Sequence, residues 1–203
     1  MPIEQGSAEW FAIRCGKVTA SRMADMTAKT KTGYAASRAN YMAEIICERL
    51  TGRKSEGYTS ASMQWGTDTE PQARLAYQFL TDNIVTEVGF VEHPAIKMSG
   101  ASPDGLINDD GMLEIKCPNT STHIETLLGA PISGGHIKQM QWQMACTGRD
   151  WNDYESFDPR LPAELQTKII RTMRDNEMIG FLEAETISFL REVDEKIEAL
   201  RNL

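Results

Sequence analysis

The stretch SPDGLINDDGMLEIKC, residues 102–117, has the pattern of a β-hairpin. Its centre, Asp109-Asp110-Gly111, is rich in turn-forming residues. The residues that follow, Met112–Cys117, alternate in the way expected of a half-buried strand. The residues before the turn, Ser99–Asn108, read as strand mixed with turn. We therefore expect two antiparallel strands joined by a tight turn in this part of the chain.

Charged side chains converge on this hairpin. Side chains two residues apart on a strand point to the same face, so Glu114 and Lys116 project together while Ile115 enters the core. The hairpin brings Asp104 beside Glu114. Two carboxylates and an ammonium group suit a hard cation such as Mg²⁺ and a phosphodiester. Lys116 could act there as a base or as an electrostatic stabiliser. A Glu-x-Lys pair by itself is more often a solvated surface feature.

Helical patterns precede the hairpin. We expect a helix over 7–14, a second one beginning at Thr19 or Ser21, and a polar loop over 27–37. Longer helices are predicted over Ser37–Leu50 and Thr67–Leu80. Pro71 should lie in the first turn of the latter helix. Its buried stripe should consist of Ala73, Leu75, Ala76, Phe79 and Leu80. A strand is predicted over Ile84–His93, and it completes a three-stranded meander with the hairpin.

Helices and strands also alternate after the hairpin. Helices are predicted over Ser121–Leu128 and Gly135–Cys146, and strands over Trp151–Phe157 and Gln166–Arg171. An amphipathic helix should run from Asp175 to Leu203 and bury Ile179, Leu182, Ile187, Leu190, Val193, Ile197 and Leu200. The order of elements favours an α/β or α+β fold with a central mixed β-sheet flanked by helices. No repeat or linker divides the chain, so we expect a single domain over 1–203.

Composition excludes several classes of protein. The chain has 203 residues, 41% of them hydrophobic, which is enough to bury a core. No apolar run is long enough to cross a membrane, and residues 1–9 lack the features of a secretory signal, so we expect a cytoplasmic protein. The four cysteines are widely spaced, which disfavours zinc and redox motifs. The net charge of −8 leaves DNA open as a partner, because binding needs only a local basic face.

Five motifs resemble a known family when they are taken in order. Pro103-Asp104 with Glu114-x-Lys116 looks like the PD-(D/E)xK nuclease signature. More narrowly, the chain resembles the lambda exonuclease family, the YqaJ-type viral recombinases. The motifs that carry this resemblance are Trp10-x-x-x-Arg14 followed by Val18-Thr19-Ala20-Ser21, then Trp65-Gly66-x-x-x-Glu70, Ser102-Pro103-Asp104-Gly105, Glu114-Ile115-Lys116-Cys117-Pro118, and Gln139-x-Gln141.

The resemblance implies a metal-dependent nuclease on a restriction-endonuclease-like core. Asp104, Glu114 and the backbone carbonyl of Ile115 would bind Mg²⁺, with Mn²⁺ as a substitute. Glu70 would hold the metal directly or through water. Lys116 would complete the catalytic set. Without the resemblance, Glu70 would be read as an acid that complements a helix dipole.

Further positions follow from the same resemblance. Arg14, Ser21 and Ser102 would form a pocket for a 5′-phosphate, which suits a forked guanidinium and hydroxyl donors. Gln141 would lie near the scissile phosphate. Residues 139 and 141 do not share a helical face, so only one of Gln139 and Gln141 should point to the site. Lys31 falls where the family has a basic loop that contacts DNA. The three histidines match no motif, and we expect ordinary structural or surface roles for them.

The family resemblance also implies an activity and partners. Its members digest the 5′-phosphorylated strand of double-stranded DNA to mononucleotides and leave a 3′ single-stranded tail. They act with a single-strand annealing protein, and the best-known members are ring-shaped trimers. Two alternatives stay open. A structure-specific or restriction-type endonuclease would share the core trio but not need a 5′-phosphate. A non-catalytic module would bind DNA ends without shortening them.

Overall fold

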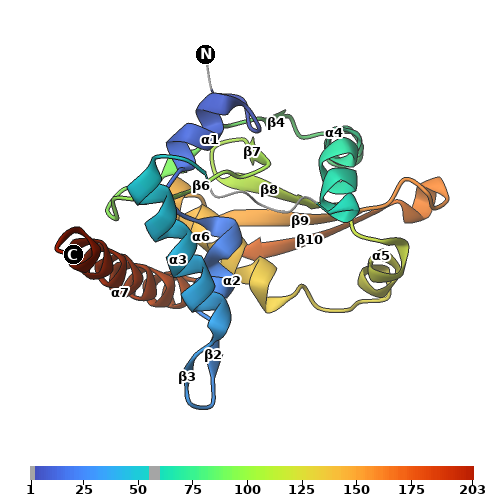
Figure 1. Cartoon of the computed structure of the whole chain (residues 1–203). Helices are drawn as coiled ribbons and strands as arrows, with labels where there is room; N and C mark the ends of the chain where they lie inside the picture. The colour runs from blue at the N-terminus through green and yellow to red at the C-terminus, as the bar shows by residue number, and fades with distance from the viewer. Residues whose placement is uncertain (1–2, 55–59) are drawn as a thin grey trace.

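The computed structural model describes residues 3–54 and 60–203. A five-stranded mixed sheet forms its centre, in the order β10-β9-β8-β7-β4 (Figure 1). Its strands are β4 (Val85–Thr86), β7 (Gly105–Ile107), β8 (Gly111–Lys116), β9 (Trp151–Phe157) and β10 (Thr167–Met173). Within this sheet the β8–β9 pair is parallel and the other three pairs are antiparallel. The predicted α/β fold with a mixed sheet is therefore confirmed.

The predicted hairpin is present as β7 and β8. Gly105 pairs with Leu113 and Ile107 with Gly111 across the turn. Gly111 leaves no room for a side chain, because a Cβ there would lie 2.0 Å from the ring of Trp151. This close approach lets β9 pack directly beside the start of β8. The hairpin thus joins the rest of the sheet at a fixed register.

The strand predicted over Ile84–His93 is wrong as a continuous element. Only β4 and β5 (Val91–Glu92) are extended there, and they belong to different sheets. The chain crosses between the sheets at Gly89, where a Cβ would lie 2.5 Å from the carbonyl oxygen of Ile3. Similarly, β6 (Ser99–Ala101) pairs with β5 and with β1 (Val18–Thr19) in a second sheet. Residues 102–104 form the bend between β6 and β7.

Short helices cover the N-terminal side of this arrangement. α1 (Ala8–Arg14) begins as predicted after Ser7, whose hydroxyl accepts a hydrogen bond from the Trp10 amide. The second predicted helix is reduced to a 3₁₀ turn, η1 (Ala20–Arg22), and one turn of α2 (Met23–Met26). The predicted loop over 27–37 contains a small hairpin, β2 (Lys29–Thr30) and β3 (Gly33–Tyr34), which projects from the body in Figure 1. α3 (Ala36–Thr51) ends at Gly52 in the left-handed conformation.

Helix α4 (Ala61–Thr81) is longer than predicted. It begins at the N-cap Ser60, whose hydroxyl accepts from the Met63 amide, so Pro71 lies in the helix interior and not in its first turn. The predicted buried stripe is wrong for its three large residues, whereas Ala73 is buried and Ala76 is partly buried against the core. Leu75, Phe79 and Leu80 are exposed, with 88% of Phe79 accessible. The helix instead buries Thr69, Ala73 and Tyr77. Small residues and a tyrosine allow α4 to approach the sheet closely.

The C-terminal half follows the prediction closely. α5 (Thr120–Leu127), α6 (Gly134–Thr147) and α7 (Asn176–Arg201) match the predicted helices within two residues. A short 3₁₀ turn, η2 (Ala163–Leu165), precedes β10. α7 buries most of its predicted face against α3 and α6, although Ile187 and Leu200 are exposed. The main core gathers Tyr41, Trp142, Leu182 and Phe189 among its largest side chains.

A second core lies between α4 and the sheet. It contains Ala73, Tyr77, Ile107, Leu113, Ile115, Trp151 and Phe157. None of the helices in the described part of the chain is long and apolar enough to cross a membrane.

Candidate active site

The predicted acidic centre forms at the end of β8. Asp104, in the bend before β7, accepts a hydrogen bond from the backbone amide of Ile115 at 2.7 Å. Glu114 is fully buried and forms an ion pair with Lys116. The two charged side chains of β8 therefore lie on one face, as their spacing predicts. The bend of 102–104 holds Asp104 at the strand where Glu114 and Lys116 emerge.

Helix α6 supplies amide groups to the same carboxylate. Gln139 donates to Glu114 Oε1 at 2.6 Å, and Gln143 donates to Oε2 at 2.5 Å. Gln143 in turn accepts from Asn152 on β9 at 2.8 Å. These contacts fix the Glu114 side chain between strand and helix. The sequence reasoning missed Gln143, although its spacing of four residues from Gln139 is the helical signal that could have found it.

The expectation for Gln141 does not agree with the structure. Its side chain donates to the carbonyl of Met173 at 2.8 Å and accepts from the amide of Asp175 at 2.8 Å. It therefore ties α6 to the connection between β10 and α7, on a different face of the helix from Gln139. Positions two apart on a helix point in different directions, and the structure assigns the site-facing role to Gln139.

Electrostatic strain marks the acidic centre. Burial, and then repulsion from Glu114, raises the pKa of Asp104 well above its usual range. Burial lowers the pKa of Lys116, but Glu114 and Asp104 outweigh it, so the net shift is upward and the ammonium form is favoured. The two carboxylates of the centre therefore carry more negative charge than the single ammonium group of Lys116 can neutralise.

Glu70 approaches this centre from α4. Its carboxylate accepts from Arg74 at 2.7 Å, and Arg74 also pairs with Glu87 at 2.8 Å. Burial raises the pKa of Glu70, and repulsion from Glu114 adds to the shift. Glu70 thus lies within electrostatic reach of Glu114 but is engaged by its own helix.

A cleft of about 1120 Å³ opens beside the centre. It is lined from α1, α3, the N-terminal half of α4 and the segment that holds Ser21, and it includes Arg14 and Glu70. Asp104, Glu114 and Lys116 do not line it themselves. Glu70 connects the cleft to them electrostatically.

Arg14 and Ser102 meet at one side of this cleft. The Arg14 guanidinium donates to the Ser102 hydroxyl at 3.2 Å, and the Trp10 indole N–H donates to the same oxygen at 3.0 Å. Arg14 also stacks over the Trp10 ring at 3.8 Å. Burial lowers the pKa of Arg14 to about 10. No ion pair of Arg14 with an acid is found among the described residues, so the group is suited to receive an anion.

Ser21 and Lys31 lie apart from these contacts. Ser21 is exposed and lines the cleft, with its hydroxyl 3.5 Å from that of Thr19. Lys31 lies in the turn of the β2–β3 hairpin and is exposed. Glu185 of α7 supports this hairpin, because it accepts from Lys29 and from the Tyr34 hydroxyl, each at 2.8 Å. Lys31 therefore lies at the tip of a projecting hairpin that α7 supports.

The residues present fit a divalent metal. Asp104 and Glu114 offer carboxylate oxygens around the Ile115 backbone, and their mutual repulsion is what a cation would relieve. Within the described ranges, no three His, Cys, Asp or Glu side chains form a ready chelating group. A metal would therefore need the Ile115 carbonyl and water to complete its oxygen ligands.

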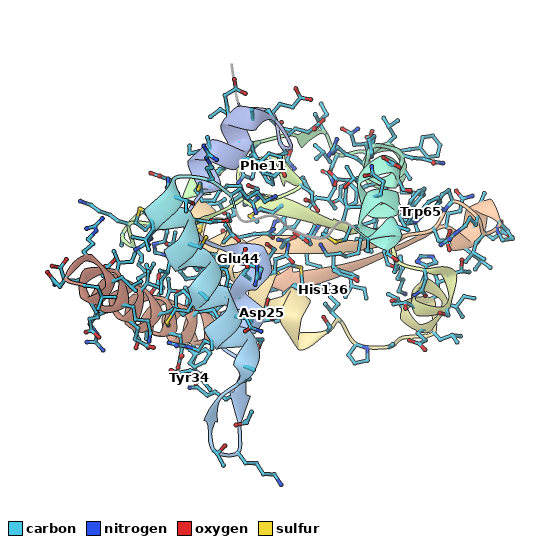
Figure 2. All side chains as sticks on the ribbon, viewed as in Figure 1. Phe11, Asp25, Tyr34, Glu44, Trp65 and His136 are labelled. Atoms are coloured by element: carbon cyan, nitrogen blue, oxygen red, sulfur yellow. The ribbon has the colours of Figure 1, made fainter. Side chains whose placement is uncertain are left out.

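Figure 2 shows the side chains of the segments that surround the central sheet. The labelled side chains Phe11, Glu44 and His136 lie around the central sheet, with Trp65 on α4 opposite them. Phe11 and Glu44 line the cleft. The ring of His136 stacks on Tyr154, whose backbone pairs with Glu114 in the sheet. The site is thus assembled from both halves of the chain.

Comparison with solved structures identifies a near relative. An alkaline exonuclease (LHK-Exo) from Laribacter hongkongensis is 53% identical, with 97% of each chain covered and a TM-score of 0.90. The same values hold for its structure in complex with dAMP. A phage-related exonuclease from Haemophilus somnus 129PT shares the fold at 15% identity, with a TM-score of 0.75 over 91% of this chain and 96% of that one.

Comparisons of the sequence with curated proteins and with family models gave two results. No curated protein matches the chain significantly. The family model described as the YqaJ-like viral recombinase domain matches residues 9–150, which include all five motifs. The chain therefore belongs to the YqaJ-like viral recombinase family and is a homologue of an alkaline exonuclease.

Proposed function

We propose that this protein is a Mg²⁺-dependent exonuclease that digests the 5′-phosphorylated strand of double-stranded DNA in the 5′→3′ direction. It releases mononucleotides and leaves a 3′ single-stranded tail for recombination by strand annealing. The relationship to LHK-Exo, an exonuclease also solved with dAMP, supports a nuclease acting on DNA.

The bend of 102–104 is the observation that carries this proposal. Ser102 is held by Arg14, while Asp104, two residues on, is held by the Ile115 amide. Two residues span at most about 7 Å, so a terminal phosphate at Arg14 would lie a short, fixed distance from the acidic centre. Cleavage at a fixed distance from a bound 5′-phosphate yields short products of constant length. An endonuclease has no need for this coupling.

Asp104, Glu114 and the Ile115 carbonyl would hold Mg²⁺, with Glu70 acting directly or through water. When bound, the metal supplies charge stabilisation for the phosphate and lowers the pKa of a water molecule. We assign the ammonium of Lys116 to the phosphate as a charged donor, since its neighbours favour the protonated form. Gln139 holds the Glu114 carboxylate in place.

The hydrolysis then regenerates its own recognition element. Water oxygen forms a bond to phosphorus as the bond from phosphorus to the 3′ oxygen breaks, and the released nucleotide leaves with a 3′ hydroxyl group. The phosphate stays on the next nucleotide as a new 5′-phosphate. Arg14, Ser21 and Ser102 would bind it for the next round, and Lys31 would contact the duplex from the β2–β3 hairpin.

The wider assembly is part of the proposal. Family resemblance suggests a ring trimer and a single-strand annealing protein as partner. Exposed apolar side chains on α4 support some protein–protein contact there, because contiguous patches of this kind commonly mark interfaces.

The direct test uses linear duplex DNA with and without a 5′-phosphate, in Mg²⁺ and in EDTA. We expect mononucleotides from the phosphorylated strand only when Mg²⁺ is present, with the other strand intact. Asp104→Asn and Lys116→Ala should each reduce the rate at least a hundredfold with little change in melting temperature, because both groups lie at the acidic centre. Internal cuts indifferent to the end would show an endonuclease. Stable DNA binding without any cleavage would show a binding module.

Arg14→Gln should lose the preference for phosphorylated ends. We expect the ratio of rates on phosphorylated and unphosphorylated ends to fall roughly tenfold or more, which corresponds to one charge-assisted hydrogen bond. The matched control is Arg149→Gln, because within the described part of the chain Arg149 donates to the backbone carbonyls of Ile107, Asn108 and Gly111 and to no other group. An unchanged ratio in Arg14→Gln would refute the phosphate pocket.

A further inference from the structure

The chain has three histidines, and two of them serve the fold. His123 is buried, and its ring nitrogens contact the Ser156 hydroxyl at 2.7 Å and the Leu165 carbonyl at 2.8 Å. His93 accepts from the amides of Ala95 and Ile96 at 3.2 and 3.1 Å. Both side chains are therefore committed to internal contacts.

His136 differs because its ring nitrogens have no hydrogen-bond partner among residues 3–54 and 60–203. It is half-buried in the first turn of α6 and stacks on Tyr154, with ring centroids 5.6 Å apart. In Figure 2 it lies at the start of α6. The ring is held in place while its polar atoms stay available.

The helix directs this ring toward the acidic centre. Residues three and seven positions apart share a helical face, so His136 continues the row formed by Gln139 and Gln143. Both glutamines donate to Glu114. The charges of Lys116 and Glu114 both reach the imidazole. Tyr154, on which it stacks, is the cross-strand neighbour of Glu114. His136 therefore lies one helical turn before Gln139, packed on the strand next to the one that carries Glu114 and Lys116.

Resting on the proposed nuclease function, we propose that His136 contacts the substrate: its imidazole N–H donates a hydrogen bond to a phosphate oxygen of the digested strand beside Lys116. The ring would orient the phosphodiester, and Lys116 would neutralise its charge. Neither the sequence motifs nor the relationship to other exonucleases assigns this role to the residue.

The surroundings suit a neutral donor. Burial, and then the positive charge of Lys116, lowers the pKa of His136 below its usual value, so the ring is uncharged at neutral and alkaline pH. A neutral imidazole still carries one N–H donor. The ring also lies at the N-terminus of a 14-residue helix, where the partial positive charge favours an anion.

Two substitutions distinguish the contribution of the imidazole N–H donor from that of the stacked ring. His136→Phe keeps the stacked ring but removes the N–H, and His136→Gln keeps a donor in a flexible side chain. We expect the Phe variant to lose roughly tenfold to a hundredfold in kcat/KM, the range for a hydrogen bond to a charged group, and the Gln variant to regain most of this activity. The melting temperature should stay unchanged. A Phe variant with wild-type activity, or a Gln variant as poor as Phe, would overturn the proposal.

A binding measurement on the wild-type protein tests the contact without turnover. With ¹⁵N-labelled histidine, dAMP in EDTA should shift the imidazole resonances of His136 and leave those of His93 and His123 in place. Single substitutions assign the three signals. If dAMP binds but moves only the other two, or none, the contact does not exist. Wild-type protein that fails to cleave DNA would instead refute the nuclease function itself, so the two failures are distinguishable.

Discussion

At the scale of single residues, the acidic centre could be predicted because its geometry is local. Asp104, Glu114 and Lys116 are brought together by one hairpin, and the two-residue period of a strand fixes the shared face of the last two. The glutamines belong to a helix far along the chain, and no local rule sets how that helix rotates against the sheet. The helical spacing therefore predicts that only one of Gln139 and Gln141 faces the site but not which one, and it is Gln139 that contacts Glu114.

These two glutamines form a matched pair for a test. Gln139→Ala should lower kcat roughly tenfold with a small change in stability, since its amide orients Glu114. Gln141→Ala should instead lower stability and leave kcat unchanged. It removes contacts to Met173 and Asp175, which should lower the free energy of unfolding by about 1–3 kcal/mol and leave the activity of the folded protein intact. Rate measurements and urea denaturation on both variants check this, and equal effects on kcat would contradict the assignment.

At the scale of elements, α4 shows why helix prediction failed in part. The helix carries two apolar rows, and hydrophobicity alone favours Leu75 and Phe79 over the smaller Ala73 and Thr69. The row of smaller residues faces the sheet because α4 packs closely against it, and the Tyr77 hydroxyl donates a hydrogen bond to Asp153 at 2.7 Å. Pro71 lacks the N–H for an interior helical bond, so sequence rules placed it at a helix start. Packing against the sheet outweighs both local preferences.

This close packing also buries Glu155 on β9. The side chain has no accessible surface, and neither carboxylate oxygen has a hydrogen-bond partner within the described residues. Burial raises the pKa of Glu155 to about 8 and outweighs the opposing effect of the Arg74 charge. In the unfolded chain the Glu155 carboxyl has its ordinary, lower pKa and loses its proton at a lower pH than in the folded protein. The folded state therefore loses stability as the pH rises from that ordinary pKa toward 8.

Glu155→Gln should remove that penalty. At pH 8.5 the variant should exceed the wild type in free energy of unfolding by up to roughly 5 kcal/mol, at about 1.4 kcal/mol per pKa unit, and by little at pH 5. Urea denaturation at both pH values measures the difference. Glu125→Gln, at an exposed position of α5, is the control and should show no such dependence. A constant difference across pH would mean that Glu155 is ionised and paired in the folded protein.

At the scale of the whole molecule, the layers could be predicted and the outer surface could not. The order of helices and strands leads to a mixed sheet between helices, and Figure 1 shows this arrangement, with α4 and α7 on opposite sides of the view. The same pattern gives no information on which apolar residues remain outside. Leu75, Phe79, Leu80 and Ile84 are between 60% and 88% exposed on or just after α4. Burying these side chains would be favourable, but a single chain leaves their apolar surface in contact with water.

An interface between copies of the chain would satisfy it. If α4 forms the interface of the proposed trimer, which has three times the chain mass of 22.7 kDa, Phe79→Asp should reduce the assembly to the single-chain mass in light scattering. Leu200→Asp, at an exposed apolar position of α7, should leave the assembly unchanged. Single-turnover cleavage should survive in the Phe79 variant, because that side chain is outside the cleft and the acidic centre. The length of DNA digested per binding event should fall, because a monomer cannot encircle the duplex. A Phe79→Asp protein that keeps the wild-type mass would exclude α4 from the interface.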